Sequence, residues 1–596
     1  VKFDDTTYYD NCVNEKVLIE GYCENGYFKT MTYYCPSGCE NGTCSKQPKL
    51  TGKLTFSEPS DVFRTGIVPP VRELGGKIKE VEFQLKLADI SLRKTYGWDY
   101  LKVKKMKSST APGEPMLPMK TLVVELPKNS RVIGVQLIKG EYVAIVEKLN
   151  LAPMPEPIPL LIGVEHEFKM APKKEVYSMD TYFPGKFITY MVGSDNKKTY
   201  VLVRVWPIQY IPMKKETIVL TRAIIKVNYE EGVTITQPTH TTYAKNIILC
   251  RRELCSVAEE LANFHNSEGV STEVIDVDWI YANYQEAEDP PFNGYKNSSL
   301  PDWDRIVNYN YSLAKRIISY LRDEEEHPNL EFVTLFGNAL HLPPSYYAYI
   351  STPYDDWFPT DLFYSSPDYD FIPNYKVGRI PVNSSTEAKH VVEKIINWRE
   401  NLNESWFKNV ALVGGDPFNT SDYEYWGELS LVVMINKNYF DGMNAEKFFT
   451  SDGNFTKEKV ESVLKGGYGF AFIFTHGSGS GIAIEQGQNP QLTVEDLLNF
   501  SSNLSIPIII SSSCSNAIYD THIFYQPKPF ISLGEGILLS NASGIAYIGE
   551  SRVGFSSLVV IYDENGYISV EKGLMDEILD YVAKAYKDGG VTLGNL

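Results

Sequence analysis

A histidine and a cysteine in the C-terminal part of the chain are the residues best suited to chemistry. The apolar run Phe470-Ala-Phe-Ile-Phe-Thr475 leads into His476, and the apolar run 506–510 leads through three serines into Cys514. We expect both runs to be buried strands of a parallel sheet, whose carboxyl ends face one crevice. A histidine beside a cysteine favours the thiolate that attacks a carbonyl. The pattern therefore predicts a cysteine hydrolase with Cys514 as nucleophile and His476 as base.

Two ordinary alternatives compete with this interpretation. A free cysteine is often a small buried core residue, but Cys514 is surrounded by four serines and an asparagine, which fits the rim of a cleft better. The glycine-rich stretch 477–482 could suggest a phosphate cradle, but it lacks the lysine of a P-loop. We interpret it as a flexible rim that contacts substrate.

Composition limits the class of protein. A chain of 596 residues with 43% apolar content can bury several cores, so two to four domains are expected. The formal net charge of -18 argues against binding nucleic acid or an anionic membrane. Apolar runs stay below the ~18 residues of a membrane span, so no transmembrane segment is expected in this chain. Protein or peptide substrates are the expected partners, and the oligomeric state is left open.

The cysteines predict a disulfide framework and an oxidising compartment. Seven are assigned to disulfides: Cys12, Cys23, Cys35, Cys39, Cys44, Cys250 and Cys255. The first five cysteines cannot all pair with one another, so one of them pairs elsewhere or stays free. Cys250 or Cys255 is the available partner, and the alternative is a bridge between these two. A zinc site is the alternative, but no histidine precedes His166.

Ten Asn-x-Ser/Thr sequons support an extracellular, secreted or cell-surface glycoprotein. They are Asn41, Asn297, Asn310, Asn383, Asn403, Asn419, Asn454, Asn499, Asn503 and Asn541. Since Val1 is not an initiator methionine, we expect a mature form whose signal peptide has been removed.

The apolar periodicity predicts a multidomain chain. Residues 1–47 form the disulfide-rich module, and residues 48–242 form an all-β domain because short runs alternate with period two. After residue 243 strands and helices alternate, which predicts βαβ units in three layers. We divide this α/β block into side-by-side halves, 243–405 and 406–596, with the chemistry in the second. The expected helices are 252–266, 311–325, 385–399, 456–465 and 569–587, and the last clear strand is 544–548.

The block from about 245 to 596 resembles the gingipain-like cysteine peptidases, a branch of the caspase-like group. Four segments carry the resemblance in order: Leu335-Phe-Gly-Asn, Trp357-Phe-Pro-Thr-Asp-Leu-Phe-Tyr364, Val377-Gly-Arg-Ile-Pro-Val382 and Val410-Ala-Leu-Val-Gly-Gly-Asp416. The stretch around Pro112-Gly-Glu-Pro-Met-Leu-Pro118 looks like the family's N-terminal prodomain. The resemblance implies a caspase-like fold and an endopeptidase made as a zymogen. A loop of the β domain would occupy the cleft, and Lys102 to Lys107 is the candidate loop.

The resemblance also implies roles for single residues. Gly477 and Cys514 would supply the backbone N–H groups of an oxyanion hole. Asp416 would orient the imidazole, although Gly-Gly-Asp-Pro is also an ordinary turn. A basic side chain before the scissile bond would meet an acidic pocket residue, for which Asp422, Glu424 and Glu428 are candidates. Catalysis needs no cofactor; a structural calcium ion is plausible by resemblance, and its ligands are unknown.

Two departures from the family pattern support rival functions. Thr475 stands where the family has glycine before the histidine, and Ala517 where it has glycine after the asparagine. If position 517 needs a positive φ, alanine would be strained there. The main alternative is a non-catalytic surface, adhesion or assembly protein that retains the scaffold. Another is acyl transfer to an amine in place of water.

Overall fold

The computed structural model of the chain describes residues 54–59, 74–95, 97–108, 110–128, 130–159, 170–194, 197–231, 242–290, 311–324, 326–349, 356–402, 404–415, 426–484, 491–501, 505–524, 529–556, 558–562, 568–572 and 574–587. Within residues 1–53 it assigns only the bounds of short strands: β1 (Lys2–Phe3), β2 (Thr6–Thr7), β3 (Asn11–Asn14), β4 (Val17–Glu24), β5 (Tyr27–Tyr34), β6 (Cys39–Glu40) and β7 (Thr43–Cys44).

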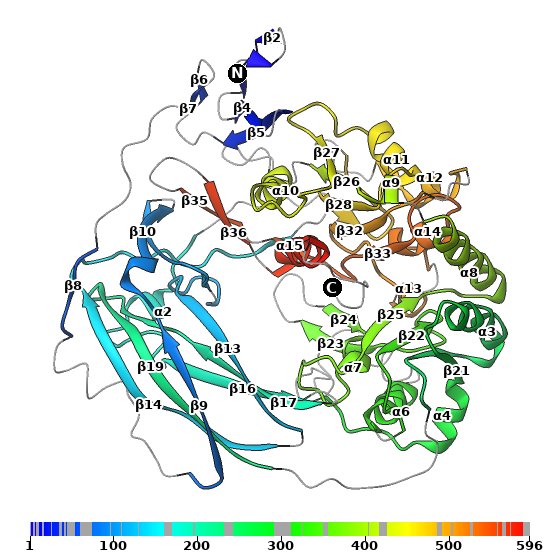
Figure 1. The fold of residues 1–596 in the computed structure, drawn as a ribbon, viewed down its shortest axis with the longest axis horizontal. Coiled ribbons are helices and arrows are strands. Elements are labelled where there is room, and N and C mark those ends of the chain that lie inside the picture. The colour runs from blue at the N-terminus through cyan, green and yellow to red at the C-terminus, as the bar shows by residue number, and fades with distance from the viewer. Residues whose placement is uncertain are drawn as a thin grey trace.

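Antiparallel sheets dominate the N-terminal part of the described chain (Figure 1). The five-stranded sheet contains β8 (Phe56–Ser57), β9 (Lys77–Gln84), β14 (Arg131–Ile145), β18 (Ile208–Ile211) and β19 (Glu216–Glu230). A four-stranded sheet contains β12 (Lys107–Ser108), β13 (Pro118–Pro127), β16 (Ile188–Ser194) and β17 (Lys198–Val205). Every second residue of β17 from Val201 to Val205 is fully buried, as expected for a strand with one face on a core.

The first parallel sheet lies in the green part of the chain and has the order β21-β20-β22-β25 (Figure 1). Its strands are β20 (Asn246–Cys250), β21 (Thr272–Asp276), β22 (Phe332–Phe336) and β25 (Lys376–Ile380). Helices α3 (Arg252–Ser267) and α8 (Ser385–Glu400) pack on one face, and α4 (Val277–Asn283) and α6 (Tyr311–Arg322) on the other. These helices follow the apolar periodicity closely, and the Ser384 side chain caps α8.

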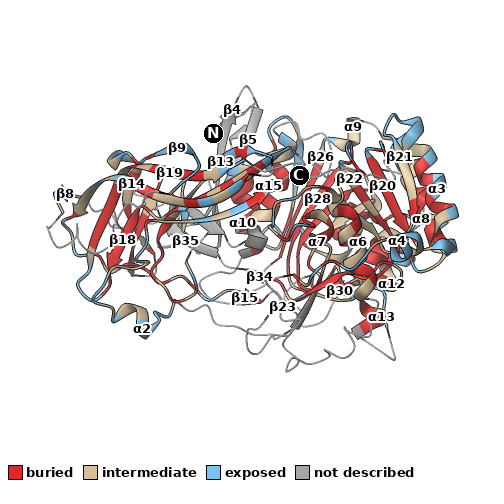
Figure 2. Ribbon diagram, turned by 90° about the horizontal axis from the view of Figure 1, so that it is seen from below, coloured by how far each residue is buried: buried red, intermediate tan, exposed pale blue. Residues whose placement is uncertain are grey.

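The second parallel sheet has the order β27-β26-β28-β32-β33. Its strands are β26 (Asn409–Gly414), β27 (Asn444–Phe449), β28 (Phe470–Phe474), β32 (Ile508–Ser512) and β33 (Ala546–Ile548). The helices are α10 (Trp426–Asn436), α11 (Lys457–Lys465), α12 (Val494–Leu498), α14 (Leu533–Leu539) and α15 (Leu574–Lys587). Apolar residues of α10 and α15 bury one face, those of α11, α12 and α14 the other, and Figure 2 shows both sheets among the buried segments.

Buried polar contacts join the two parallel sheets. Lys394 of α8 donates hydrogen bonds to the carbonyl oxygens of Ile537 (2.8 Å), Leu538 (3.2 Å) and Ser540 (2.7 Å) at the C-terminal end of α14. An ammonium group at this end satisfies carbonyls that the helix itself leaves free. The Arg379 guanidinium, paired with Asp361, lies 4.8 Å from the ring centroid of Tyr519. The first sheet therefore supports loops of the second.

A four-stranded sheet joins the β-rich part to residues near the C-terminal end, and it corrects the predicted helix 569–587. Its order is β11-β10-β35-β36, with β10 (Ile90–Thr95), β11 (Trp98–Val103), β35 (Leu558–Tyr562) and β36 (Ile568–Lys572). The predicted helix 569–587 is wrong over its first residues, because Ile568–Lys572 pairs with β35 and α15 begins at Leu574. The sequence Ile-Ser-Val-Glu alternates with period two, which antiparallel pairing favours. The strand 544–548 is likewise not the last one.

Candidate active site

Strands β28 and β32 carry His476 and Cys514 to the same edge of the second sheet. The two strands are parallel neighbours, and Phe474 is paired with Ser512. His476 and Cys514 each follow this pair by two residues, just beyond the ends of the two strands. The segments that carry His476 and Cys514 therefore leave the same edge of the sheet from adjacent strands.

The loops after these strands are in direct contact. A Cβ atom built on Gly477 would lie 2.6 Å from Cys514 O and 2.9 Å from Cys514 N. These separations are below van der Waals contact, so the position accepts only glycine without movement of a loop. The missing side chain of Gly477 therefore permits the close approach of the Cys514 main chain.

Cys514 is fully buried and is not part of a disulfide bond. It donates to Gly554 O, and Gly554 N–H donates to Sγ, both over 3.2 Å. Glu550 packs so closely that a Cβ on Gly554 would lie 1.4 Å from its Oε2. The missing side chain lets this main chain cover the sulfur.

The segment that covers the sulfur is held by the β-rich part of the chain. Gly554 leads into β34 (Phe555–Ser556), which pairs antiparallel with β15 (Ile158–Pro159). The proline-rich stretch 153–159 thus reaches the segment next to the thiol. Within Lys102 to Lys107, Lys107 instead contacts α15 through Glu577 (2.5 Å) and the Tyr581 ring (5.3 Å).

The turn after Cys514 answers the concern about Ala517. Among the described residues of this turn, the positive φ falls on Ser515 (59°) and not on Ala517. The condition for strain at Ala517 is therefore not met. Ser515 N–H donates to Arg552 O (2.8 Å) and Ala517 N–H to Glu550 O (2.9 Å), so the turn is attached to the segment that covers the thiol.

Thr475, the other departure, also fits its surroundings. Its side chain is buried and donates to Ala483 O over 2.9 Å, and its N–H donates to Ser512 O over 3.4 Å. The hydroxyl thereby satisfies a buried carbonyl of the loop that follows His476.

A buried ion pair near the site escaped the sequence analysis. The Arg552 guanidinium donates two hydrogen bonds to Asp520 (2.9 and 2.7 Å), with side-chain exposures of 3% and 0%. Tyr346 from the first half of the block also donates to Asp520, over 3.1 Å. Such a bidentate pair fixes orientation as well as charge. The sequence does contain a signal for this pair: Asp520 and Arg552 each follow a buried apolar run, 506–510 and 544–548, of the same sheet.

Two family models match the chain. Residues 239–594 match the model of peptidase family C25, and residues 78–250 match the model of the C25 propeptide. The chain belongs to peptidase family C25. This assignment confirms the resemblance to gingipain-like peptidases and makes the chain a cysteine peptidase with a propeptide region.

Individual relatives of this C25 peptidase are distant. An uncharacterized protein of Archaeoglobus fulgidus is 34% identical over 324 residues, which cover 52% of this chain and 76% of that protein. Lys-gingipain W83 of Porphyromonas gingivalis is 26% identical over 199 residues, covering 32% of this chain but only 10% of the relative.

Solved structures include the Arg-specific cysteine proteinase gingipain R, with 13% identity, 60% of this chain and 70% of that chain covered, and a TM-score of 0.39. The complex of Porphyromonas gingivalis RgpB pro- and mature domains has 16% identity, coverages of 52% and 64%, and a TM-score of 0.36.

Of the acidic residues predicted for the site of this C25 peptidase, the structure describes only Glu428. Asp416, Asp422 and Glu424 lie outside the described residues. Gly415, just before Asp416, donates its N–H to Phe474 O over 3.0 Å, next to the strand end that carries His476. Glu428 is buried at the start of α10, and its carboxylate accepts hydrogen bonds from Ser451 N (2.8 Å) and Ser451 Oγ (2.6 Å).

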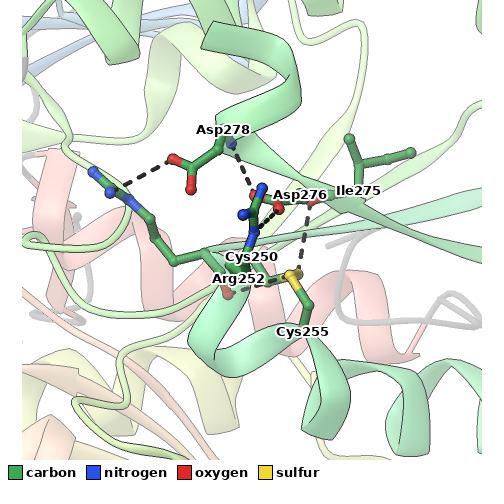
Figure 3. The surroundings of a disulfide bond; sticks show 7 residues. Cys250, Arg252, Cys255, Ile275, Asp276 and Asp278 are labelled. Carbon is green, nitrogen blue, oxygen red and sulfur yellow. Dashed lines mark hydrogen bonds and ion pairs between the residues drawn. A yellow bond between two sulfur atoms is a disulfide. The ribbon is translucent and has the colours of Figure 1, made fainter. Parts of the chain in front are cut away.

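The structure joins Cys250 to Cys255, which is one of the two alternatives left open for these cysteines (Figure 3). Their bridge connects the end of β20 to the first turn of α3, beside the ion pairs Arg252–Asp276 and Arg251–Asp278. The side chains of the five N-terminal cysteines lie outside the described residues: Cys12, Cys23, Cys35, Cys39 and Cys44.

The remaining predictions concern the surface. Among the sequons, Asn383, Asn454, Asn499 and Asn541 are exposed, and six lie outside the described residues: Asn41, Asn297, Asn310, Asn403, Asn419 and Asn503. Within the described ranges, no group of three or more His, Cys, Asp or Glu side chains could hold a metal ion. In the same part of the chain, helices of sufficient length and apolarity to cross a bilayer are absent.

Proposed function

We propose that the chain is a latent cysteine endopeptidase in which Cys514 is the nucleophile and His476 the general base. The observation that carries the proposal is the contact between the loop that follows His476 and the main chain of Cys514, at the carboxyl ends of adjacent parallel strands. Asp416 is the proposed orienting carboxylate, because it follows Gly415, which is hydrogen-bonded to the end of β28.

In the proposed reaction, His476 takes the thiol proton and the Cys514 thiolate attacks the carbonyl carbon of the scissile bond. The N–H groups of Gly477 and Cys514 would stabilise the oxyanion, and each such donor typically lowers the barrier by ~3 kcal/mol. His476 then protonates the leaving amine. Water hydrolyses the thioester, which releases the acid and restores the thiol.

Latency is proposed from the cover over the sulfur. Substrate cannot reach Cys514 while Gly554 contacts Sγ and β15 pairs with β34. An extended substrate could pair with β34 in the place of β15, since strand addition supplies main-chain hydrogen bonds without requiring a particular sequence. The match of residues 78–250 to the C25 propeptide supports this role for the β-rich part of the chain.

A weak preference for a basic residue before the scissile bond is part of the proposal. Asp422 and Glu424 are the better candidates for the acidic pocket residue, because the Glu428 carboxylate already binds Ser451. Secretion or surface display is proposed from the sequons and the cysteine-rich N-terminal segment, with extracellular proteins or peptides as substrates.

The test compares the full chain with Cys514→Ala at neutral pH in reductant. Peptide libraries with Arg, Lys, Asp or Leu before the scissile bond measure hydrolysis, and N-terminal sequencing detects a cut between about residues 210 and 246. Once the parent chain has been cut, we expect it to hydrolyse peptides and to be labelled by an acyloxymethyl ketone probe, and we expect neither from the variant. Equal behaviour of the two proteins would favour the non-catalytic scaffold, and an amide-linked product mass would favour acyl transfer.

A further inference from the structure

Asn516, two residues after Cys514, uses its amide group to connect the two loops of the site. Its side chain is fully buried. Nδ2 donates to Ser478 O (2.6 Å) and Gly481 O (3.1 Å), and Oδ1 accepts from the Tyr547 hydroxyl (3.2 Å). Both donors and the acceptor of the amide are therefore used.

The two carbonyls belong to the hairpin that directly follows His476. This hairpin consists of β29 (Gly477–Ser478) and β30 (Gly481–Ile482). Its first residue touches the same amide, because a Cβ on Gly477 would lie 2.9 Å from Asn516 Nδ2. A side chain of the cysteine loop thus determines where the histidine loop lies.

The N-terminal end of α14 supports the same junction. Gly534 N–H donates to Asn516 O (2.8 Å), and Leu533 N–H donates to Gly479 O (2.9 Å). One helix end therefore binds a main-chain oxygen from each loop, and Asn516 links the loops to each other. Relative movement of the loops would break several buried hydrogen bonds, each of which is costly to leave unmade.

We propose that Asn516 is a positioning residue that holds the His476 imidazole at its working distance from Cys514 Sγ; the proposal rests on the proposed function. The site requires two donors and one acceptor in one short planar group, which asparagine supplies. Aspartate has the same shape but places oxygen against both hairpin carbonyls. Ionisation of the thiol depends on the imidazole, so displacement of the hairpin changes the pH at which Cys514 reacts.

The test measures alkylation of Cys514 by iodoacetamide in the full chain between pH 5 and 10, with the modified peptide quantified by mass spectrometry. The variants are Asn516→Asp and Asn516→Ala. The matched control is Asn228→Asp, because Asn228 is also buried and its Nδ2 donates to two main-chain oxygens, of Leu74 (2.9 Å) and Gly75 (3.1 Å), in the β-rich part. Burial slows alkylation, but the pH midpoint still reports the ionisation of the thiol.

We expect a midpoint well below 8.5 in the parent chain and in Asn228→Asp, and a midpoint that moves toward ~8.5, the free-thiol value, in both Asn516 variants. Peptide hydrolysis should fall about 100-fold in the Asn516 variants, as for a misplaced catalytic group. An unchanged midpoint in folded Asn516 variants overturns the positioning role and leaves the peptidase intact. A parent midpoint near 8.5 instead removes the activated thiol itself, and with it the proposed function.

Discussion

At the scale of single residues, the site depends on close main-chain approach as much as on its reactive side chains. Gly477 and Gly554 lie where a Cβ would overlap neighbouring atoms. The sequence predicts His476 and Cys514 because each follows an apolar run, and Gly477 through the family resemblance. It could not find Gly554, because its contact with the thiol depends on tertiary packing of a segment forty residues later.

Gly477→Ala tests the contact between the loops. The added methyl would lie 2.6 Å from Cys514 O, so a loop must shift. We expect peptide hydrolysis to fall about 100-fold, as for other misplaced groups. The free energy of unfolding should drop by about 1–3 kcal/mol from overpacking.

The matched control for that substitution is Gly378→Ala in β25, where no heavy atom lies within 4 Å of the added Cβ. Its free energy of unfolding should change by less than about 0.5 kcal/mol, as for most surface substitutions. If Gly477→Ala retains full hydrolysis, the close approach of the loops is not required for catalysis.

At the scale of elements, α14 joins the site to the rest of the block. Its N-terminal end binds both loops, Lys394 binds its C-terminal carbonyls, and Glu535 forms a capping box with Ser532. The sequence predicted α3, α6, α8 and α11 to within a few residues because their apolar faces are periodic. The start of α15 was missed, since pairing with β35 overrides the local pattern at 568–572.

Stability should depend on pH through Glu535. Burial raises its pKa to about 7, against opposing hydrogen bonds from Ser532. The folded state therefore retains a proton that the unfolded state has lost above pH ~4.5, and stability falls as the pH rises from about 4.5 through 7. Glu535→Gln retains the capping geometry and should flatten this slope in thermal unfolding between pH 4.5 and 7.5.

The control is Asp496→Asn, which alters the equivalent residue of the Thr493 capping box in α12. Burial opposes ionisation of Asp496, but hydrogen bonds from Lys457 and Thr493 lower its pKa. Its contribution is therefore lost only as the pH falls below the ordinary aspartate range, and this variant should leave the slope between pH 4.5 and 7.5 unchanged. A slope that persists in Glu535→Gln would assign the effect to another group.

At the scale of the whole molecule, the β-rich part contacts the peptidase block at several separate places. Ile158–Pro159 pairs with β34, Lys107 pairs with Glu577, and Lys128 pairs with Glu324. The sequence predicted an all-β part followed by βαβ units, because the spacing of the apolar residues changes near residue 243. It could not predict which β segment reaches the site: the lysine-rich stretch was the candidate, whereas the proline-rich stretch makes the contact next to the thiol.

Charge reversal tests whether these contacts protect the thiol. Lys107→Glu places a like charge against Glu577, and a partly exposed pair of this kind contributes about 0.2–1 kcal/mol. Loss of this free energy would make the exposed form of Cys514 more populated. We therefore expect alkylation of Cys514 in the full chain to accelerate by roughly two- to fivefold. The double variant Lys107→Glu/Glu577→Lys restores the pair and should return the rate to that of the parent. Equal rates in all three proteins would show that this contact does not govern access.

The sheet β11-β10-β35-β36 has a consequence for biosynthesis. Lys94 pairs with Tyr562, so a strand made early acquires its neighbour only after residue 562 has left the ribosome. Until then the β10 edge offers unpaired main-chain groups to any other nascent chain, a known route to aggregation. Shortened products that stop before residue 558 should therefore accumulate in inclusion bodies, and co-expression of a holdase chaperone should rescue their solubility.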